Sequence, residues 1–161
     1  MGVIPGLTRN PFSTMDSRFR GNDLFEQGAN EVNEVSEGMN YLIIGIGGFA
    51  GAMARYAVAV WIGQRWGRSF PLGTFAVNVS GSFLIGLFMT LMAVRFTENP
   101  QWRLLLVVGF LGAYTTFSTF EYETGALLTD GEWLYALLNV VMSVVAGFIA
   151  LKLGEVIAKS I

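Results

Sequence analysis

The chain has 161 residues, of which 53% are hydrophobic and 14% charged, and its net charge at pH 7 is -2. This composition is typical of an integral membrane protein, and it shows none of the basic surplus that binds nucleic acid. Cysteine and histidine are both absent, which excludes disulfides, a thiol nucleophile and any metal site built on these two residue types.

Residues 1–38 form a polar segment with two prolines, several Gly and Asn, and an acidic run over residues 26–37. The segment lacks helical periodicity and the apolar core of a signal peptide, so we expect it to be disordered. A hydrophobic segment begins directly at Met39, where a compact membrane protein would start. Two interpretations are open: the start codon is assigned too far upstream, or residues 1–38 are a cytoplasmic tail.

Four apolar stretches follow, each near the ~20 residues that cross a bilayer. They cover residues 40–62, 72–94, 102–128 and 133–153, and short connections join them. Tryptophans lie at or near their ends, as interfacial anchors do: Trp61, Trp66, Trp102 and Trp133. We therefore predict an all-α integral membrane protein whose residues 39–161 form one four-helix domain. The loops are too short to fold into a soluble domain, so the function must take place in the membrane.

Four spans place both ends of the domain on one side of the membrane. The basic residues on that side are Arg95, Arg103, Lys152 and Lys159, and those on the other side are Arg65 and Arg68. A difference of about two charges is a weak orientation signal. Insertion in one orientation and insertion in both are equally compatible with it.

The first span contains GGFAGAMARY at residues 47–56. Gly47 and Gly51 form a GxxxG pair, and Gly48 repeats the spacing with Ala52, so we expect close packing against another helix. Arg55 lies inside the span but within snorkelling reach of the interface. It could hold an anion at a vestibule or simply anchor the helix.

Polar side chains recur at intervals of four along the second and fourth spans, so each set shares one helix face. The second span carries Thr74, Asn78 and Ser82, and the fourth carries Asn139, Ser143 and Gly147. An amide in mid-span needs a partner, which leaves two interpretations of Asn78. It either links helices or donates an N–H to an anion, and the fourth-span residues allow the same two interpretations.

The third span is interrupted by residues 109–120, which read GFLGAYTTFSTF. We expect the helix to unwind around residues 112–115 and to free carbonyl oxygens, which suit a cation. Phe117 and Phe120 then share a helix face, either as a packing pair or with their positive ring edges toward an anion. Ser118 and Thr119 offer hydroxyl groups between the two rings.

The predicted lining consists of neutral hydrogen-bond donors, with no acidic residue in mid-span. A proton-coupled exporter normally carries a titratable group there, and a cation channel often carries a ring of carboxylates. The lining therefore favours a dehydrated anion. A proton-coupled exporter of small ions stays the alternative, with Glu121 and Glu123 as its candidate titratable groups. A membrane scaffold without transport activity would leave the polar residues at intervals of four on the second and fourth spans unexplained. An enzyme is not expected, because no nucleophile–base pair or phosphate loop is present.

Three segments resemble the Fluc (CrcB) family of bacterial fluoride channels: GGFAGAMARY, GTFAVNVSGSF at residues 73–83, and GFLGAYTTFSTFEYE at residues 109–123. The resemblance extends from Met39 to the C-terminus, and residues 1–38 have no counterpart in the family pattern. It implies an antiparallel, dual-topology homodimer of four-helix subunits, each with a broken third helix, in the bacterial inner membrane. Such a channel conducts fluoride passively, excludes chloride and lowers cytoplasmic fluoride.

The resemblance also implies roles for single residues. The positions that match the fluoride pathway are Asn78, Phe117, Phe120, Ser118, Thr119, Ser143, Asn139 and Glu123, while Arg55 matches a vestibule arginine. Backbone carbonyls of Gly112 and Thr115 would bind a structural sodium ion (Na+) at the dimer interface, which is not transported. Several members carry tyrosine at the position of Asn139. Asparagine still donates hydrogen bonds but lacks the ring, so its part in fluoride contact is open.

Overall fold

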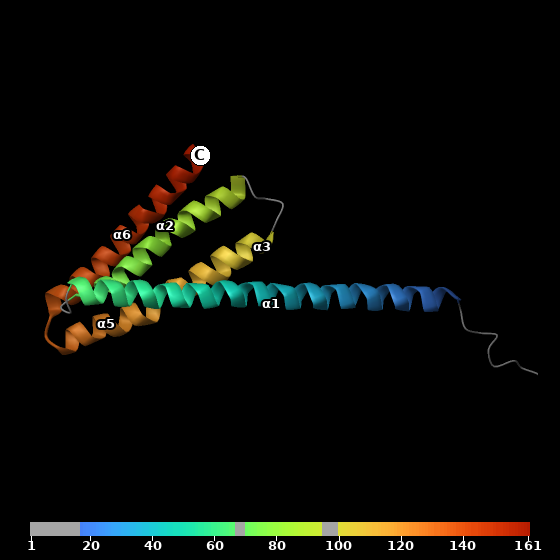
Figure 1. The fold of residues 1–161 in the computed structure, drawn as a ribbon, viewed down its shortest axis with the longest axis horizontal. Helices are drawn as coiled ribbons and strands as arrows, with labels where there is room; N and C mark the ends of the chain where they lie inside the picture. The colour runs from blue at the N-terminus through green and yellow to red at the C-terminus, as the bar shows by residue number, and fades with distance from the viewer. Residues whose placement is uncertain (1–16, 67–69, 95–99) are drawn as a thin grey trace, which may run out of the picture. The chain divides into compact units, whose positions relative to one another are not determined.

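A computed structural model describes residues 17–66, 70–94 and 100–161, without the side chains of residues 17–35, 94 and 100. All regular structure in these ranges is helical (Figure 1). The chain divides into two compact units, Met1–Met39 and Asn40–Ile161. Every site considered below lies in the second unit.

Four helical segments in the described part are long and apolar enough to cross a membrane, which confirms the predicted all-α membrane class. The first lies in α1 (Ser17–Trp66), the second is α2 (Leu72–Val94) and the fourth is α6 (Trp133–Ser160). The third consists of η1 (Arg103–Leu111), α4 (Gly112–Tyr114) and α5 (Phe117–Thr129), and the short α3 (Pro100–Trp102) precedes it. The chain is thus a multi-pass membrane protein.

Helix α1 begins earlier than the sequence predicts. The prediction placed its start near residue 40, whereas the structure begins it at Ser17, inside the segment expected to be disordered. The Glu, Gln and Ala residues there have good helix propensity, and extending an existing helix avoids the cost of nucleation. Residues 1–16 lie outside the described part.

Helices α2 and α6 lie side by side (Figure 1). Glycines on each helix let the backbones touch: Gly86 lies against the carbonyl of Leu151, and Gly154 lies against the backbone of Phe83 and Leu87. A Cβ on Gly154 would come within 2.8 Å of the Leu87 amide nitrogen. Close backbone approach of this kind is typical of membrane helices, because the hydrophobic effect does not drive helices together in lipid and van der Waals packing must do so.

The predicted GxxxG packing is confirmed between α1 and η1. Gly47 lies against the carbonyl of Leu105, and Gly51 lies against the carbonyl of Phe110. From the other side, a Cβ on Gly109 would come within 2.7 Å of the Ile44 carbonyl oxygen. Three glycines therefore bring the two backbones into direct contact, and a larger side chain at any of them would push the helices apart.

The nine residues of η1 form a π-helix, which the sequence did not indicate. Its hydrogen bonds reach one residue further than those of an α-helix, and the amide of Gly112 accordingly donates to the carbonyl of Val107. π-Helical turns are rare, and they are frequently found at functional sites. This one leads directly into the interruption described below.

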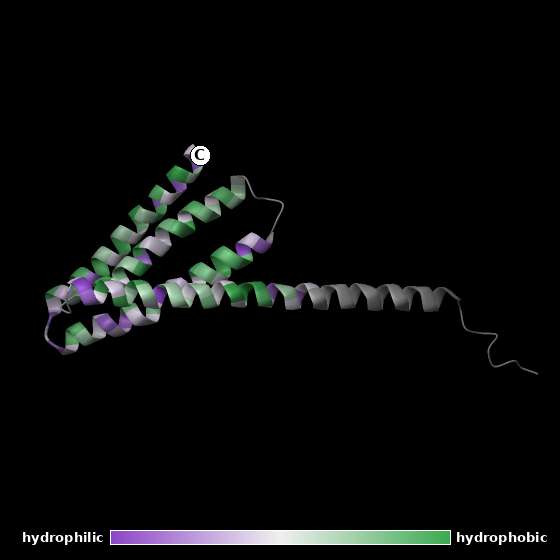
Figure 2. Cartoon of the chain, viewed as in Figure 1, coloured by the Kyte–Doolittle hydropathy of each residue, from purple (hydrophilic) through white to green (hydrophobic). Residues whose placement is uncertain are grey.

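The buried core of the second unit is small. Val77, Leu111 and Tyr114 form its centre, and half-buried residues of α1 and α2 pack around them. Most other large apolar side chains are exposed, and Figure 2 shows hydrophobic residues along the length of α2 and α6. Helices that are apolar beyond their packed faces belong in lipid or against another membrane protein.

Candidate functional site

The third span is interrupted at Thr115 and Thr116. Both residues have extended backbone, with φ and ψ of -79° and 155° at Thr115 and -149° and 123° at Thr116. The sequence placed the unwinding at residues 112–115, but Gly112–Tyr114 is still α-helical. The side chain of Thr116 caps α5 by accepting from the amide of Thr119. The interruption is therefore shorter than expected and lies nearer the C-terminus.

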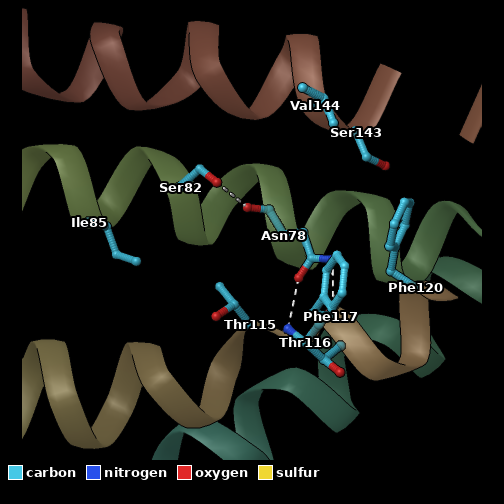
Figure 3. A pocket seen from close by; sticks show the side chains of 9 residues that line it. All are labelled: Asn78, Ser82, Ile85, Thr115, Thr116, Phe117, Phe120, Ser143 and Val144. Carbon is cyan, nitrogen blue, oxygen red and sulfur yellow. Dashed lines mark hydrogen bonds between the residues drawn. The ribbon is translucent and has the colours of Figure 1, made fainter. Parts of the chain in front are cut away.

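The side chain of Asn78 bridges from α2 to this interruption. Its Nδ2 donates to the carbonyl of Thr116 at 2.9 Å, and its Oδ1 accepts from the amide of Thr116 at 2.9 Å (Figure 3). Extended backbone inside a membrane needs such partners, because no water is available to it. The interhelical interpretation of Asn78 is thus confirmed. An amide has two N–H groups, and Thr116 takes one; among the described residues the other has no acceptor.

A cavity of about 300 Å³ lies beside this bridge (Figure 3). It is bounded by α2, the interruption, the first turn of α5 and the middle of α6. The lining residues are Asn78, Ser82, Ile85, Thr115, Thr116, Phe117, Phe120, Ser143 and Val144. No charged side chain is among them, so the cavity offers only neutral groups to whatever enters it.

Most hydroxyl groups of the cavity donate their hydrogen to the protein itself. Ser82 donates to the carbonyl of Asn78 at 2.8 Å, and Thr115 donates to the carbonyl of Leu111 at 3.0 Å. Thr116 donates to the hydroxyl oxygen of Thr119 at 3.0 Å. Ser143 differs, because its Oγ is buried and has no hydrogen-bond partner among the described residues. The cavity therefore holds two uncommitted donors, the Ser143 hydroxyl and one N–H of Asn78.

Two aromatic rings complete the cavity wall. The centroids of Phe117 and Phe120 are 5.8 Å apart, and their planes are inclined by 35°. Phe117 is 69% exposed in the single chain, so packing within the subunit does not account for its position. Ser118 and Thr119 lie between the rings in sequence but are exposed and outside the cavity. The structure thus brings the two rings to the site and leaves the two hydroxyl residues beside it.

Asn139 is also outside the cavity. It is only 1% exposed, and its Nδ2 donates to the Thr124 hydroxyl oxygen at 2.8 Å. Ser143, one helical turn further along α6, lines the cavity instead. The polar residues predicted on one face of α6 therefore differ in their surroundings: Asn139 bonds another helix, and Ser143 lines the cavity.

Glu123 lines a second cavity, of about 640 Å³, between the end of α1 and the start of α2. The Oε2 of its carboxyl group is buried and has no hydrogen-bond partner among the described residues. Arg55 is half-buried and lines neither of these two cavities. The carboxylate and the guanidinium are therefore separate from the neutral cavity.

Sequence reasoning missed two threonines of this region. Thr116 could have been found, because threonine is a favoured N-cap residue and it stands directly before the helical turn that carries Phe117 and Phe120. Thr124 gave no such signal, since its role depends on meeting Asn139 from another helix. Ile85 and Val144 were missed because the sequence does not distinguish an apolar residue that lines a cavity from one that faces lipid.

Two carbonyl groups near the interruption lack their usual donors. In an uninterrupted helix the amides of Thr116 and Thr119 would donate to the carbonyls of Gly112 and Thr115. Here those amides donate to Asn78 Oδ1 at 2.9 Å and to the Thr116 hydroxyl at 3.3 Å. Within the described residues no cluster of three or more acidic side chains could hold a metal. These carbonyl oxygens are instead the groups that could accept a cation.

Comparison with known proteins identifies a protein family and several relatives that this chain is similar to. The family model for "CrcB-like protein, Camphor Resistance (CrcB)" matches residues 42–155. A fluoride-specific ion channel FluC of Solibacter usitatus is 50% identical over 121 residues, which are 75% of this chain and 99% of that protein. The protein of the same name from Acidobacterium capsulatum is 49% identical over 123 residues, 76% of this chain and 98% of the relative. That of Chlorobaculum tepidum is 50% identical over 120 residues, 74% and 94% of the two chains.

Proposed function

Because the chain belongs to the CrcB-like family, several of whose members carry the name fluoride-specific ion channel, we propose that it is a fluoride channel. It lets fluoride leave the cell passively, down its electrochemical gradient, and so lowers cytoplasmic fluoride. The observation that carries this proposal is the neutral cavity, in which the buried Ser143 hydroxyl has no protein partner among the described residues. A small anion is the natural acceptor for such a donor.

Bringing a bare anion into this cavity requires several donors that act together. Desolvating an ion in a medium of low dielectric costs on the order of tens of kcal/mol, far more than one hydroxyl can return. Ser143 and the second N–H of Asn78 supply two donors, and the positive edges of Phe117 and Phe120 add weaker attraction. A set of modest contacts without a fixed positive charge lets the ion enter and also leave, as conduction requires.

A sodium ion fits the carbonyl groups freed at the interruption, which in this proposal lies in mid-span. Hard cations prefer oxygen ligands, and the carbonyls of Gly112 and Thr115 have lost the amides that would occupy them in a helix. Gly112 is exposed in the single chain, so its surroundings can be completed by a second copy. Gly112 and Thr115 of two subunits would hold the ion as a structural element at their interface.

An antiparallel homodimer in the bacterial inner membrane is part of the same proposal. Ile46, Phe49, Met53 and Tyr56 recur every three or four residues along α1, so they share one face, and each is more than half exposed. An uncovered apolar face of this kind meets either lipid or a partner. The weak difference in basic charge between the two membrane sides suits a subunit that inserts in both orientations.

Ion efflux from liposomes tests the function directly. Purified protein is reconstituted into vesicles loaded with fluoride or with chloride, and efflux is followed with ion-selective electrodes in the absence of a proton gradient. We expect rapid fluoride efflux and retention of chloride. If fluoride leaves only when a proton gradient is imposed, the protein is a coupled exporter, and Glu121 and Glu123 become the first residues to substitute.

A further inference from the structure

A directed chain of two hydrogen bonds connects α6 to the backbone of Phe120. Asn139 Nδ2 donates to Thr124 Oγ1 at 2.8 Å, and the Thr124 hydroxyl donates its own hydrogen to the Phe120 carbonyl at 2.7 Å. Asn139 is 1% exposed, so water does not compete for this amide in the single chain. Each donor in the chain has one acceptor, and the last acceptor belongs to a residue of the cavity wall.

The position of α5 depends on contacts of this kind. The helix begins after two extended residues, so continuous helical hydrogen bonding does not set its rotation relative to the segment before it. Of the two helices α2 and α6, it contacts α6 more extensively. In the described part of the chain, Asn139–Thr124 is the one side-chain hydrogen bond that joins α5 to α6.

Resting on the proposed function, we propose that Asn139 is a positioning residue that sets anion selectivity through Thr124. The hydrogen-bond chain fixes the turn of α5 from Phe120 to Thr124 against α6, and so fixes the distance between the Phe120 ring and the Ser143 hydroxyl. That distance decides whether a small anion can touch both groups and a larger one cannot. Asn139 does this without meeting the ion, because it is buried and does not line the cavity.

Substitutions along the hydrogen-bond chain test this role. Asn139→Leu removes the first hydrogen bond and keeps the branching of the side chain at Cγ. Thr124→Val removes both hydrogen bonds with little change in volume, and Thr124→Ser keeps the hydroxyl. Thr129→Val is the matched control, because Thr129 also bonds a carbonyl of α5, that of Gly125 at 3.0 Å, but is exposed and far along the helix from Phe120. The main readout is the ratio of fluoride to chloride efflux from liposomes.

We expect Asn139→Leu and Thr124→Val each to lower this ratio by about tenfold, since a small displacement of a contacting group has effects of at least this size. The double variant should lose no more than either single variant, because both break the same chain. Thr124→Ser and Thr129→Val should keep the wild-type ratio. An unchanged ratio in Thr124→Val, or an equal loss in Thr129→Val, would overturn the proposal.

Hydrogen exchange separates this proposal from the proposed function. Amide exchange of residues 117–124 in detergent is expected to be faster in Asn139→Leu and Thr124→Val than in wild type and Thr129→Val. If wild-type protein conducts no fluoride, the proposed function fails while faster exchange still supports the positioning of α5 by Asn139. Unchanged exchange in both variants overturns the positioning itself, whatever the protein conducts.

Discussion

The Ser143 hydroxyl can be separated experimentally from the other hydroxyls of its cavity. Ser143→Ala removes a buried donor that has no protein acceptor among the described residues, so the folded chain loses little. A bound anion loses a hydrogen bond worth about 1.5–3 kcal/mol, and we expect fluoride efflux to fall at least about tenfold. The matched control is Ser82→Ala, since Ser82 lines the same cavity but already donates to Asn78. Equal losses in the two variants would contradict the special role of Ser143.

The ring of Phe120 offers a second test. Phe120→Ile keeps an apolar side chain but removes the positive ring edge, so fluoride efflux should drop by about tenfold while the stability of the assembly changes by less than about 1.5 kcal/mol. Efflux is measured in liposomes and stability by thermal unfolding in detergent. Phe83→Ile serves as control, because this ring lies on α2 outside the cavity. Should both properties of Phe120→Ile fall together, Phe120 is a packing residue.

Single residues were predictable only as far as their own chemistry allows. The sequence marked Asn78 as an amide that needs a partner but left linking and anion binding open, because spacing along one helix does not identify a residue on another. The structure gives that partner as Thr116, 38 residues away, and still leaves one N–H for the cavity. Asn139 shows the same limit, since the spacing that places it beside Ser143 says nothing of Thr124.

The contact between α1 and η1 predicts that alanine substitution affects stability differently at two glycines of α1. A Cβ on Gly47 meets the Leu105 carbonyl and comes within 3.0 Å of the Phe110 amide nitrogen, whereas a Cβ on Gly45 meets nothing within 4 Å. Gly47→Ala should therefore destabilise the protein by about 1–3 kcal/mol, because backbone atoms cannot move aside. Gly45→Ala should be neutral or slightly stabilising through helix propensity. Thermal unfolding in detergent compares them, and equal midpoints would argue against the α1–η1 contact.

Helices were easier to predict than their irregularities. The GxxxG spacing of Gly47 and Gly51 identified a contact face, because small residues four apart have few other uses in a span. The π-helix of η1 was not foreseen, since its apolar sequence is compatible with either helix type. The interruption was expected at residues 112–115, but it lies at Thr115 and Thr116. Asn78 bonds the backbone of Thr116 there, and the Thr116 side chain caps α5.

The four-span architecture followed from the lengths of the apolar stretches alone, since little else in a protein requires about 20 apolar residues in a row. The family model matches residues 42–155, which confirms the family resemblance drawn from the sequence, and the relatives are named as ion channels and not as enzymes. Assembly lay beyond such reasoning, because an apolar face looks the same whether lipid or a second subunit covers it. The proposed homodimer therefore needs an experiment on the whole assembly.

Removing sodium provides that experiment. If the carbonyls of Gly112 and Thr115 from two subunits bind sodium, the ion stabilises the dimer by mass action, by about 2.7 kcal/mol at a concentration one hundred times its Kd. Protein purified with potassium at the same ionic strength should then unfold at a lower temperature, and the dimer should dissociate more readily during size-exclusion chromatography. Returning sodium should restore both properties. A midpoint that is the same in sodium and in potassium would mean that the freed carbonyls are not a sodium site, while the neutral cavity and its fluoride efflux would still stand or fall on the variants of Ser143 and Phe120.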